Sequence, residues 1–439
     1  MRLTNGMWLW AAGAVFAALA GPAAAGDRAA GAARAKAVRL FNGKDLKGWK
    51  QTGKAEFLVR DGCLVGTQTT GAGGDLWTEG QWDNFDLRVT YRMVWPANSG
   101  FWFRHDGRKG YQYDVLKWKR PIAFSGSLYC PGKLFITRNL DEPLESRDGW
   151  NEARVWANGD RLVQWLNGRC VGDCRDKTLA KGRVGIQVHG GGQFKGMEIV
   201  VREMTIRPLA PDEAPPIRKL KAVLWVGGFA HDFDAIAKLL AEALPKRLPI
   251  DIRVVRDGGF LDSPEANGLD VILMNHCYKS ADGVLTDKQK RKLLDRVRGG
   301  VGVVAMHASY YSFLKWDDYR ELFGARFTSH GSSNARLAVT VVDKDHTVTE
   351  PVAEGFEVTS ELYASTPLAK GCRVLARAVE KGKPATAQPA VWVRTYGRGR
   401  VVTMLPGHWP DSYRAAALQK LIAAGAVWVA RRPAEKGSR

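Results

Sequence analysis

Histidines are the residues of this chain whose positions most clearly suggest chemistry. Six of the eight lie beyond residue 220, and four of these follow apolar runs that predict strands. The carboxyl ends of parallel strands meet at one edge of an α/β sheet, where ligands bind. Imidazoles gathered there perform acid–base work near neutral pH or bind a transition metal. We therefore expect a crevice that brings together His231, His276, His307 and His408.

Other polar residues on predicted loops are candidates to join this crevice: Asp232, His330, His346 and Glu361. Two interpretations of the site remain open at this point. It holds a divalent metal, with His307, His408 and His231 as candidate ligands, or it works without one. A set of polar loop residues that simply tolerate exposure is the alternative to both.

Polar side chains inside aromatic-rich strands form a second group of candidates, before residue 210. Successive side chains of a strand point to opposite faces. The pairs that share a face are Gln112 with Asp114, Gln187 with His189, and Trp102 with Arg104. A ligand-binding surface explains such positions, and a solvated outer face is the alternative. Tryptophans stack on sugar rings or fill the core, and the candidates here are Trp82, Trp95, Trp102 and Trp118.

Two patterns of predicted elements divide the chain. Residues 38–208 contain short alternating runs separated by Gly, Asn and Asp, which is typical of an all-β sandwich or jelly roll. Residues 209–219 are rich in proline and charge, which favours a linker. In residues 220–432, apolar strand runs alternate with helices, and this predicts an α/β domain with a mostly parallel sheet.

Composition limits the class of protein further. The 439 residues, of which 45% are hydrophobic, are enough for two globular domains. Residues 1–25 have a basic start, an apolar stretch and a small-residue end, so we expect a signal peptide and a secreted or periplasmic protein without a membrane anchor. The net charge is +20, but the basic residues are scattered, which favours a solvated surface over nucleic-acid binding.

The six cysteines are too few to form a disulfide scaffold in a chain of this length. Cys170 and Cys174 are the close pair. No second Cys or His pair lies nearby, so we expect a loop disulfide between them rather than half of a zinc site.

The second half of the chain resembles the ThuA-like (trehalose utilisation) family. Five segments carry the resemblance: VGVVAMHA, WDDYRELFGARFTSH, KDHTVTE, SELY and AVWVRTYGRGRVVTMLPGHW. That family shares the fold of class I glutamine amidotransferases, so the resemblance implies a flavodoxin-like α/β domain. The amidotransferases present a cysteine nucleophile where this chain has His307, and Cys277 follows a different strand. Thioester chemistry is therefore not expected.

The chain departs from the ThuA-like pattern at two positions. The usual His-Pro is His346-Thr347, and the usual Asp-Glu-Leu-Tyr is Ser360-Glu361-Leu362-Tyr363. The loss of a carboxylate at residue 360 puts a metal or acid role at that position in doubt. His307, His330, His408 and Glu361 match the family.

Residues 38–208 resemble the 3-keto-disaccharide hydrolase family, also described as 3-keto-glucoside lyase and hydratase. The segments that carry this resemblance are LFNGKDLKGW, ANSGFWFRHD, GYQYDV, GSLY, GWNEARVWANGDRLVQWLNG and GRVGIQVH. The family has a concanavalin-like jelly-roll fold, and both families are associated with 3-keto sugars. Some members have Glu-x-Gln where this chain has Gln112-Tyr113-Asp114. The carboxylate of this chain is therefore two residues later in the strand and on the same face.

The reaction that this resemblance implies sets requirements for the site. A ketone at C3 acidifies the hydrogen on C2, so a base removes it, the C1 substituent leaves with a proton from an acid, and water then adds. The developing oxyanion needs a donor or a cation. The candidates are Asp114 or His189 as base, Arg104 or Lys117 as oxyanion stabiliser, and Tyr111, Tyr129 or His105 as proton donor. The candidates for substrate binding are Gln112, Trp102, Asn98, Tyr129 and Gln187.

Taken together, the sequence predicts an exported carbohydrate-active enzyme that cleaves 3-keto-glycosides by elimination and hydration, a net hydrolysis. One alternative is a glycan-binding jelly roll with any chemistry confined to the α/β domain, and another is a non-catalytic carbohydrate-binding protein. The expected partner is an oligosaccharide or 3-keto-glycoside, not a nucleic acid or a membrane. A divalent metal is the candidate cofactor.

Overall fold

The computed structural model describes residues 35–430 of the chain. The expected signal peptide, residues 1–25, lies outside these residues. Residues 209–219, between the two folded regions, contain no helix or strand. In the described part of the chain, no helix is both long and apolar enough to span a bilayer.

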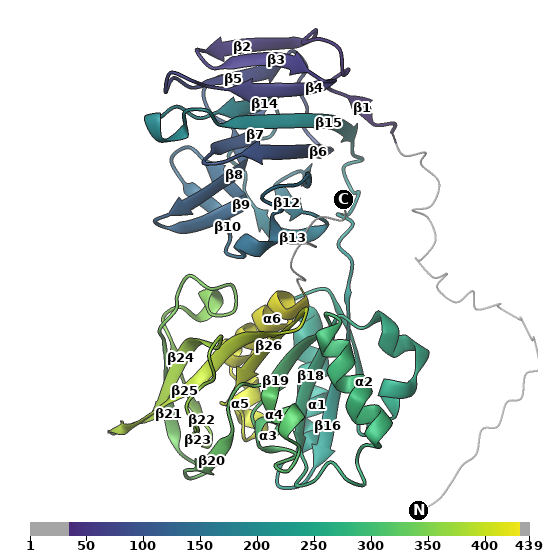
Figure 1. The fold of residues 1–439 in the computed structure, drawn as a ribbon, viewed down its shortest axis with the longest axis vertical. Coiled ribbons are helices and arrows are strands. Elements are labelled where there is room, and N and C mark those ends of the chain that lie inside the picture. The colour runs from purple at the N-terminus through teal and green to yellow at the C-terminus, as the bar shows by residue number, and fades with distance from the viewer. Residues whose placement is uncertain (1–34, 431–439) are drawn as a thin grey trace, which may run out of the picture. The chain divides into compact units, whose positions relative to one another are not determined.

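Residues 38–208 form a sandwich of two antiparallel sheets, drawn in purple to teal in Figure 1. Each sheet buries one face because apolar and polar residues alternate along its strands. In spatial order, the eight-stranded sheet consists of β13 (Arg169–Arg175), β12 (Arg161–Leu166), β11 (Asn151–Asn158), β6 (Phe85–Val94), β15 (Glu198–Pro208), β4 (Cys63–Thr67) and β3 (Glu56–Arg60), with β1 (Val38–Arg39) paired to β15.

The seven-stranded sheet packs its inner face against the eight-stranded one. In spatial order it consists of β10 (Leu134–Asn139), β9 (Ile122–Cys130), β8 (Tyr111–Lys119), β7 (Asn98–His105), β14 (Arg183–Val188), β5 (Gly74–Thr78) and β2 (Trp49–Gly53). Phe101 and Tyr113 from this sheet share one hydrophobic core with Leu87 and Ile199 from the other. Their neighbours along each strand therefore point to the outer face.

Residues 220–430 form an α/β domain around a nine-stranded mixed sheet. Its first five strands pair in parallel: β17 (Ile250–Val255), β16 (Leu220–Gly228), β18 (Val271–Cys277), β19 (Gly302–Met306) and β26 (Gly399–Met404). Four antiparallel strands extend it: β25 (Lys383–Tyr396), β24 (Arg373–Glu380), β21 (Arg336–Val341) and β22 (Phe356–Thr359). The sheet is thus parallel on one side only, whereas the alternation of strands and helices predicted a mostly parallel sheet.

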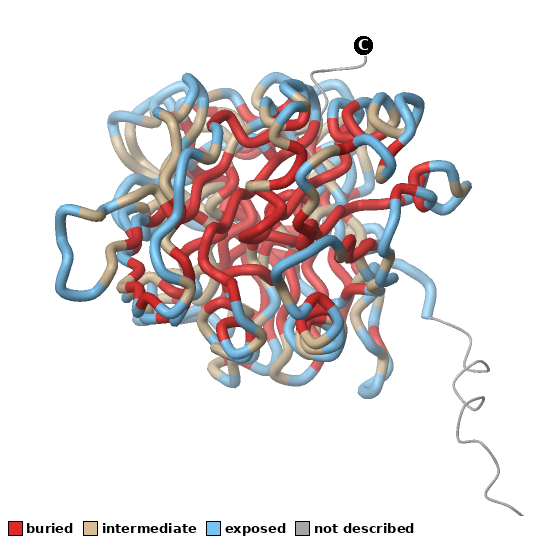
Figure 2. Tube along the Cα trace, turned by 90° about the horizontal axis from the view of Figure 1, so that it is seen from below, coloured by how far each residue is buried: buried red, intermediate tan, exposed pale blue. Residues whose placement is uncertain are grey.

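The helices of this domain cover both faces of its parallel strands (Figure 1). They are α1 (Phe233–Ala243), α2 (Asp287–Arg298), α3 (Ala308–Tyr311), α4 (Asp317–Glu321), α5 (Pro410–Arg414) and α6 (Ala416–Ala430). Leu224 of β16 packs with α1 and α6, whereas its neighbour Val223 packs with α2. Buried residues, red in Figure 2, gather along these strands, and exposed residues lie in the surrounding loops.

A two-stranded sheet, β20 (Phe327–His330) with β23 (Tyr363–Ser365), completes the domain. It brings His330 opposite Tyr363, two residues after Glu361.

The disulfide expected between Cys170 and Cys174 is wrong, because both residues are thiols. They lie four positions apart on β13. An extended strand rises about 3.3 Å per residue, so their Cα atoms stand about 13 Å apart. A disulfide requires a Cα separation below about 7 Å.

Candidate functional site

His307 occupies a strained turn between β19 and α3. Its φ is 43°, a left-handed backbone conformation that residues other than glycine rarely adopt. Its backbone amide donates to the Met404 carbonyl at 2.7 Å, and its Nδ1–H donates to the Leu405 carbonyl, also at 2.7 Å. Strain of this kind persists where the surroundings fix it, often at functional sites. Because Nδ1 carries the proton, Nε2 presents a lone pair to the other side of the ring.

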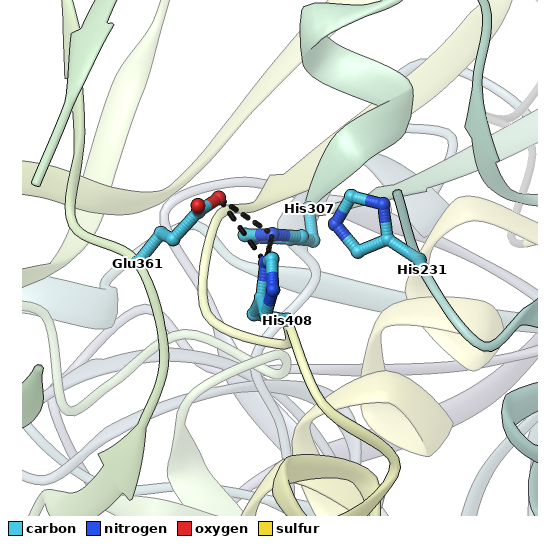
Figure 3. A group of neighbouring side chains, drawn as sticks. All are labelled: His231, His307, Glu361 and His408. Carbon is cyan, nitrogen blue, oxygen red and sulfur yellow. Dashed lines mark hydrogen bonds and ion pairs between the residues drawn. The ribbon is translucent and has the colours of Figure 1, made fainter. Parts of the chain in front are cut away.

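His307, His408, Glu361 and His231 form what we call the histidine–glutamate centre (Figure 3). The Nε2 atom of His307 lies 3.2 Å from Nδ1 of His408 and 3.5 Å from Oε2 of Glu361. The same carboxylate oxygen lies 3.2 Å from Nδ1 of His408. One ligand atom from each of the four residues lies within 4.8 Å of the other three.

His231, which follows β16, faces this group from the side opposite Glu361 (Figure 3). Its ring centroid is 4.6 Å from that of His408 and 5.2 Å from that of His307. Its Nδ1 lies 3.2 Å from the Phe229 carbonyl, to which it donates. Its Nε2 atom is buried without a hydrogen-bond partner among the described residues. The structure thus brings together four of the candidates from the sequence, three of which follow parallel strands.

Burial and mutual contact set the charges of the centre. Burial lowers the pKa of His231 to about 4, and it also lowers the pKa of His307. Burial opposes ionisation of Glu361, but the neighbouring imidazoles of His307 and His408 outweigh it and hold the pKa of the carboxyl well below its usual range. The centre therefore combines an ionised carboxylate with imidazole lone pairs. Such a group can hold a cation or relay a proton.

Three neighbours surround the centre. The Tyr363 ring stacks on His307 at 4.5 Å, with its hydroxyl 3.3 Å from Nε2. His330 is exposed, and its Nδ1 lies 3.3 Å from Oε1 of Glu361. Ser360, at the position of the missing carboxylate, accepts hydrogen bonds from the amides of Gly407 and His408. The serine thus holds the loop that carries His408 instead of entering the centre.

Three histidine-site candidates lie elsewhere. His276 is inside β18. Its ring centroid lies 4.2 Å from that of Trp225 and its Nδ1 is hydrogen-bonded to the Ser312 hydroxyl, because its side chain points to the face that α2 covers. His346 packs on Trp428 at 5.2 Å. Asp232 caps α1 by accepting from the Ala235 amide. The expectation that these residues join the crevice is wrong.

Because side chains alternate between the two faces of a strand, most of the jelly-roll candidates lie on the outer face of the seven-stranded sheet. One row across the strands pairs Asp75 with Gln187, Gln187 with Gly100, and Gly100 with Asp114. The next row pairs Trp77, Gly185, Trp102, Gln112 and Tyr129 in that order. We call the surface formed by these two rows, together with Asn98 and His189, the Asp114 face.

Two polar groups of the Asp114 face are buried without a partner. Asp114 is 3% exposed and makes no hydrogen bond or ion pair with any residue in 35–430. Burial raises the pKa of its carboxyl well above the usual value. The Nε2 atom of Gln112 is also buried without an acceptor. Buried polar groups are normally satisfied, so these two point to a ligand.

Asp75 is a functional candidate that sequence reasoning missed. Its Oδ1 accepts from Nε1 of Trp102 at 2.9 Å. Burial raises the pKa of Asp75, and His189 nearby acts in the opposite direction. The signal was present in the alternation of GDLWT, which puts Asp75 and Trp77 on one face. Nδ1 of the exposed His189 donates to the Gly190 carbonyl, so its Nε2 carries the lone pair.

Three catalytic candidates do not fit their expected roles. Arg104 is 1% exposed and donates to the carbonyls of Asp83, Gly159 and Leu179, because its positive φ and a slip in pairing beside it remove it from the Asp114 face. The Tyr111 hydroxyl is on the core side and donates to Asp176 at 2.7 Å. Lys117 is exposed and pairs with Glu142 at 2.8 Å.

The aromatic candidates divide between the face and the core. Trp102 packs against Tyr129 at 6.2 Å, and His105 lies 4.2 Å from Trp77, so these rings line the Asp114 face. Trp82 and Trp95 pack against the sandwich core instead. Trp118 is 39% exposed, with its Nε1 donating to the Arg120 carbonyl.

Family comparisons match both domains. A model described as a 3-keto-alpha-glucoside-1,2-lyase-like domain matches residues 36–207, and one described as trehalose utilisation (ThuA) matches residues 221–429. The chain joins a domain of each family. Both descriptions concern sugars, so the function is carbohydrate-related, and the first points to an enzyme that acts on glycosides. No curated protein matches the chain.

Solved structures each resemble a part of the chain. A protein described as ThuA-like from Parabacteroides merdae is 19% identical, covering 48% of this chain and 90% of its own, with a TM-score of 0.42. A protein described as a glycosyl hydrolase from Parabacteroides distasonis is 20% identical, covering 40% and 94%, with a TM-score of 0.32. The carbohydrate binding module CBM66 from Bacillus subtilis is 16% identical, covering 36% and 95%, with a TM-score of 0.30.

Proposed function

We propose that the chain cleaves a 3-keto-glycoside at the Asp114 face by elimination followed by hydration. The observation that carries this proposal is the pair of buried, unpartnered groups, the Asp114 carboxyl and the Gln112 amide, on a face lined with aromatic rings. The match of this domain to the 3-keto-alpha-glucoside-1,2-lyase-like family supports the choice of substrate.

The chemistry requires three groups around the sugar. A base takes the proton from C2, and the electron pair left behind is delocalised onto the C3 oxygen. The C1–O bond then breaks, a C1–C2 double bond forms, and the departing oxygen takes a proton from an acid. Water adds to C1 while a proton returns to C2. The sum is one glycoside and one water converted to a 3-keto sugar and the free alcohol.

Residues of the Asp114 face match these needs. His189 has its Nε2 lone pair free to act as base, and Asp75 beside it stabilises the imidazolium that forms. The unpartnered Gln112 N–H is a donor for the oxyanion on C3, in place of Arg104 or Lys117. Asp114, with its raised pKa, keeps a proton to higher pH than an ordinary carboxyl and is the acid.

Gly100 lies between base and acid, and the Gln112 side chain covers it. It stands between Gln187 and Asp114 in the same row. The strands of His189 and Asp114 are two spacings apart, about 10 Å. Packing is tight here, since a Cβ at Gly100 would come within 2.7 Å of Gln112 Cγ. Trp102 and Tyr129 offer rings for stacking, and Asn98 and Gln187 offer hydrogen bonds to hydroxyls.

Incubation of a nitrophenyl 3-keto-glucoside with the mature chain in D₂O tests the proposal. We expect nitrophenol release and deuterium on C2 of the product, above the exchange of product incubated alone. His189→Ala and Asp114→Asn should each lower kcat/KM by about 100-fold or more, while Arg88→Ala, on the eight-stranded sheet, should leave it unchanged. Release without deuterium would mean direct hydrolysis, and binding without release would favour a glycan-binding module.

Export is a separate proposal, which rests on the pattern of residues 1–25. We propose that the mature protein is secreted or periplasmic. Mass spectrometry of the protein from cell fractions should find an N-terminus near residue 26 outside the cytoplasm. An intact Met1 in the cytoplasmic fraction would contradict it.

A further inference from the structure

The spacing within the histidine–glutamate centre matches the edges of a tetrahedron around a metal. Zinc binds imidazole nitrogen and carboxylate oxygen at about 2.0–2.1 Å, so two ligand atoms of a tetrahedral site lie about 3.4 Å apart. The three separations among His307 Nε2, His408 Nδ1 and Glu361 Oε2 are 3.2, 3.2 and 3.5 Å. Three donor atoms therefore already stand where three vertices of one tetrahedron would be.

The tautomers of two histidines direct lone pairs to the middle of the centre. His307 and His231 each use Nδ1–H to donate to a backbone carbonyl, of Leu405 and Phe229 respectively. Metal-bound histidines almost always donate their other ring N–H in this way. The Nε2 atom of His231 is buried and has no partner among the described residues, although it is turned toward the other ligands (Figure 3). His231 thus offers the fourth ligand atom of the group, within 4.8 Å of the other three.

The charge of the centre also calls for a cation. The Glu361 side chain is 10% exposed, and no lysine or arginine in residues 35–430 forms an ion pair with it. Its polar neighbours are histidines whose ring protons are partly committed elsewhere. A buried carboxylate is normally paired or bound to a metal. A donor set of three imidazoles and one carboxylate suits zinc and its neighbours in the transition series rather than calcium or magnesium.

From this geometry we propose that the α/β domain binds one divalent transition-metal ion, of the zinc class, through His307, His408, Glu361 and His231. The site lies in a different domain from the Asp114 face and stands whether or not the proposed glycoside cleavage is correct. Ser360, which fixes the His408 loop, and Tyr363, which stacks on His307, are positioning residues of this site.

Metal binding by the full mature chain tests the site directly. After removal of metal with a chelator, we expect one equivalent of Zn²⁺ to bind. Co²⁺ should give the intense visible bands of a tetrahedral ion, which Zn²⁺ displaces. His307→Ala, His408→Ala and Glu361→Gln should each weaken Zn²⁺ binding at least 100-fold, and His231→Ala at least 10-fold. His346→Gln, a histidine of the same domain outside the centre, should bind as the wild type does.

Two results would overturn the proposal. One is a wild-type chain that binds no stoichiometric Zn²⁺, and the other is full affinity in His408→Ala. An unchanged affinity in His231→Ala would remove that residue from the ligand set. X-ray absorption of the Zn²⁺-loaded wild type needs no variant, so it decides the matter even if the variants fail to fold. It should show scattering from three imidazoles and one oxygen, and a different first shell would contradict the assignment.

Discussion

The hydroxyl oxygen of Ser360 accepts a hydrogen bond from the backbone amide of His408 at 3.3 Å, and a second from Gly407 at 3.0 Å. One short side chain thus fixes the loop that carries a member of the histidine–glutamate centre. The φ of Gly407 is 137°, and a Cβ there would come within 2.6 Å of the Tyr413 hydroxyl, so the loop has little freedom to adjust. The serine therefore positions His408 through its backbone amide.

Ser360→Ala should therefore weaken Zn²⁺ binding without removing a ligand. Loss of a hydrogen-bond partner that supports a metal ligand costs about 10-fold to 100-fold in metal affinity. We expect the lower end of this range because Ser360 holds the backbone amide of His408 and not its imidazole. A competition titration with a chromogenic chelator measures it. Ser280→Ala, at a serine elsewhere in the domain, is the control. Equal affinities in the two variants would show that the loop needs no such support.

Asp114→Asn should make the sandwich more stable at pH 8 although it lowers the rate of cleavage. Burial raises the pKa of Asp114, so the folded state keeps its proton to higher pH than the unfolded chain does. Stability is therefore lost as pH rises above the unfolded pKa of about 4, and asparagine escapes this loss. Urea midpoints at pH 4 and pH 8 measure the effect. A gain that is the same at both pH values would contradict the buried, unpartnered carboxyl.

Glu145→Gln should also stabilise the sandwich above neutral pH. Glu145 is 7% exposed, and its Oε1 accepts from the Tyr91 hydroxyl at 3.2 Å. Burial raises its pKa to about 7, although Arg147 acts against this. The stability it contributes is complete below the unfolded pKa of about 4.3 and is lost as pH rises to about 7, up to about 3 kcal/mol. Urea midpoints between pH 4 and 8 should converge for the two proteins at low pH. The exposed Glu152→Gln is the control, and parallel curves would refute the prediction.

The proximity of the three histidines of the histidine–glutamate centre could be anticipated because each follows a strand of one predicted sheet. Periodicity alone cannot say which way a histidine within a strand points, and so it wrongly included His276, whose side chain faces the α2 layer. The antiparallel half of the sheet was not anticipated either. Its strands pair through long-range contacts, such as β24 with β21, that leave no local signal.

Alternation identified the Asp114 face through Gln112, Asp114 and Gln187, but it failed where a strand is irregular. Arg104 has a positive φ, and the pairing shifts beside it, so His105 takes the outer position. Asp75 was missed because a short strand with one carboxylate is not distinctive in sequence. Its contact with Trp102 joins two strands, β5 and β7, that are not consecutive in the sequence.

Arg104→Lys tests the conclusion that the Arg104 side chain lies away from the Asp114 face. The guanidinium donates through Nε to Asp83 and through one terminal nitrogen to Gly159 and Leu179, a fork that a lysine ammonium cannot reproduce. Each lost bond to a charged donor costs about 1.5–3 kcal/mol, so the variant should unfold at distinctly lower urea. Its folded fraction should keep the wild-type kcat, because the side chain does not reach the Asp114 face. A variant with wild-type stability and a kcat lowered by 100-fold would return Arg104 to the role of oxyanion stabiliser.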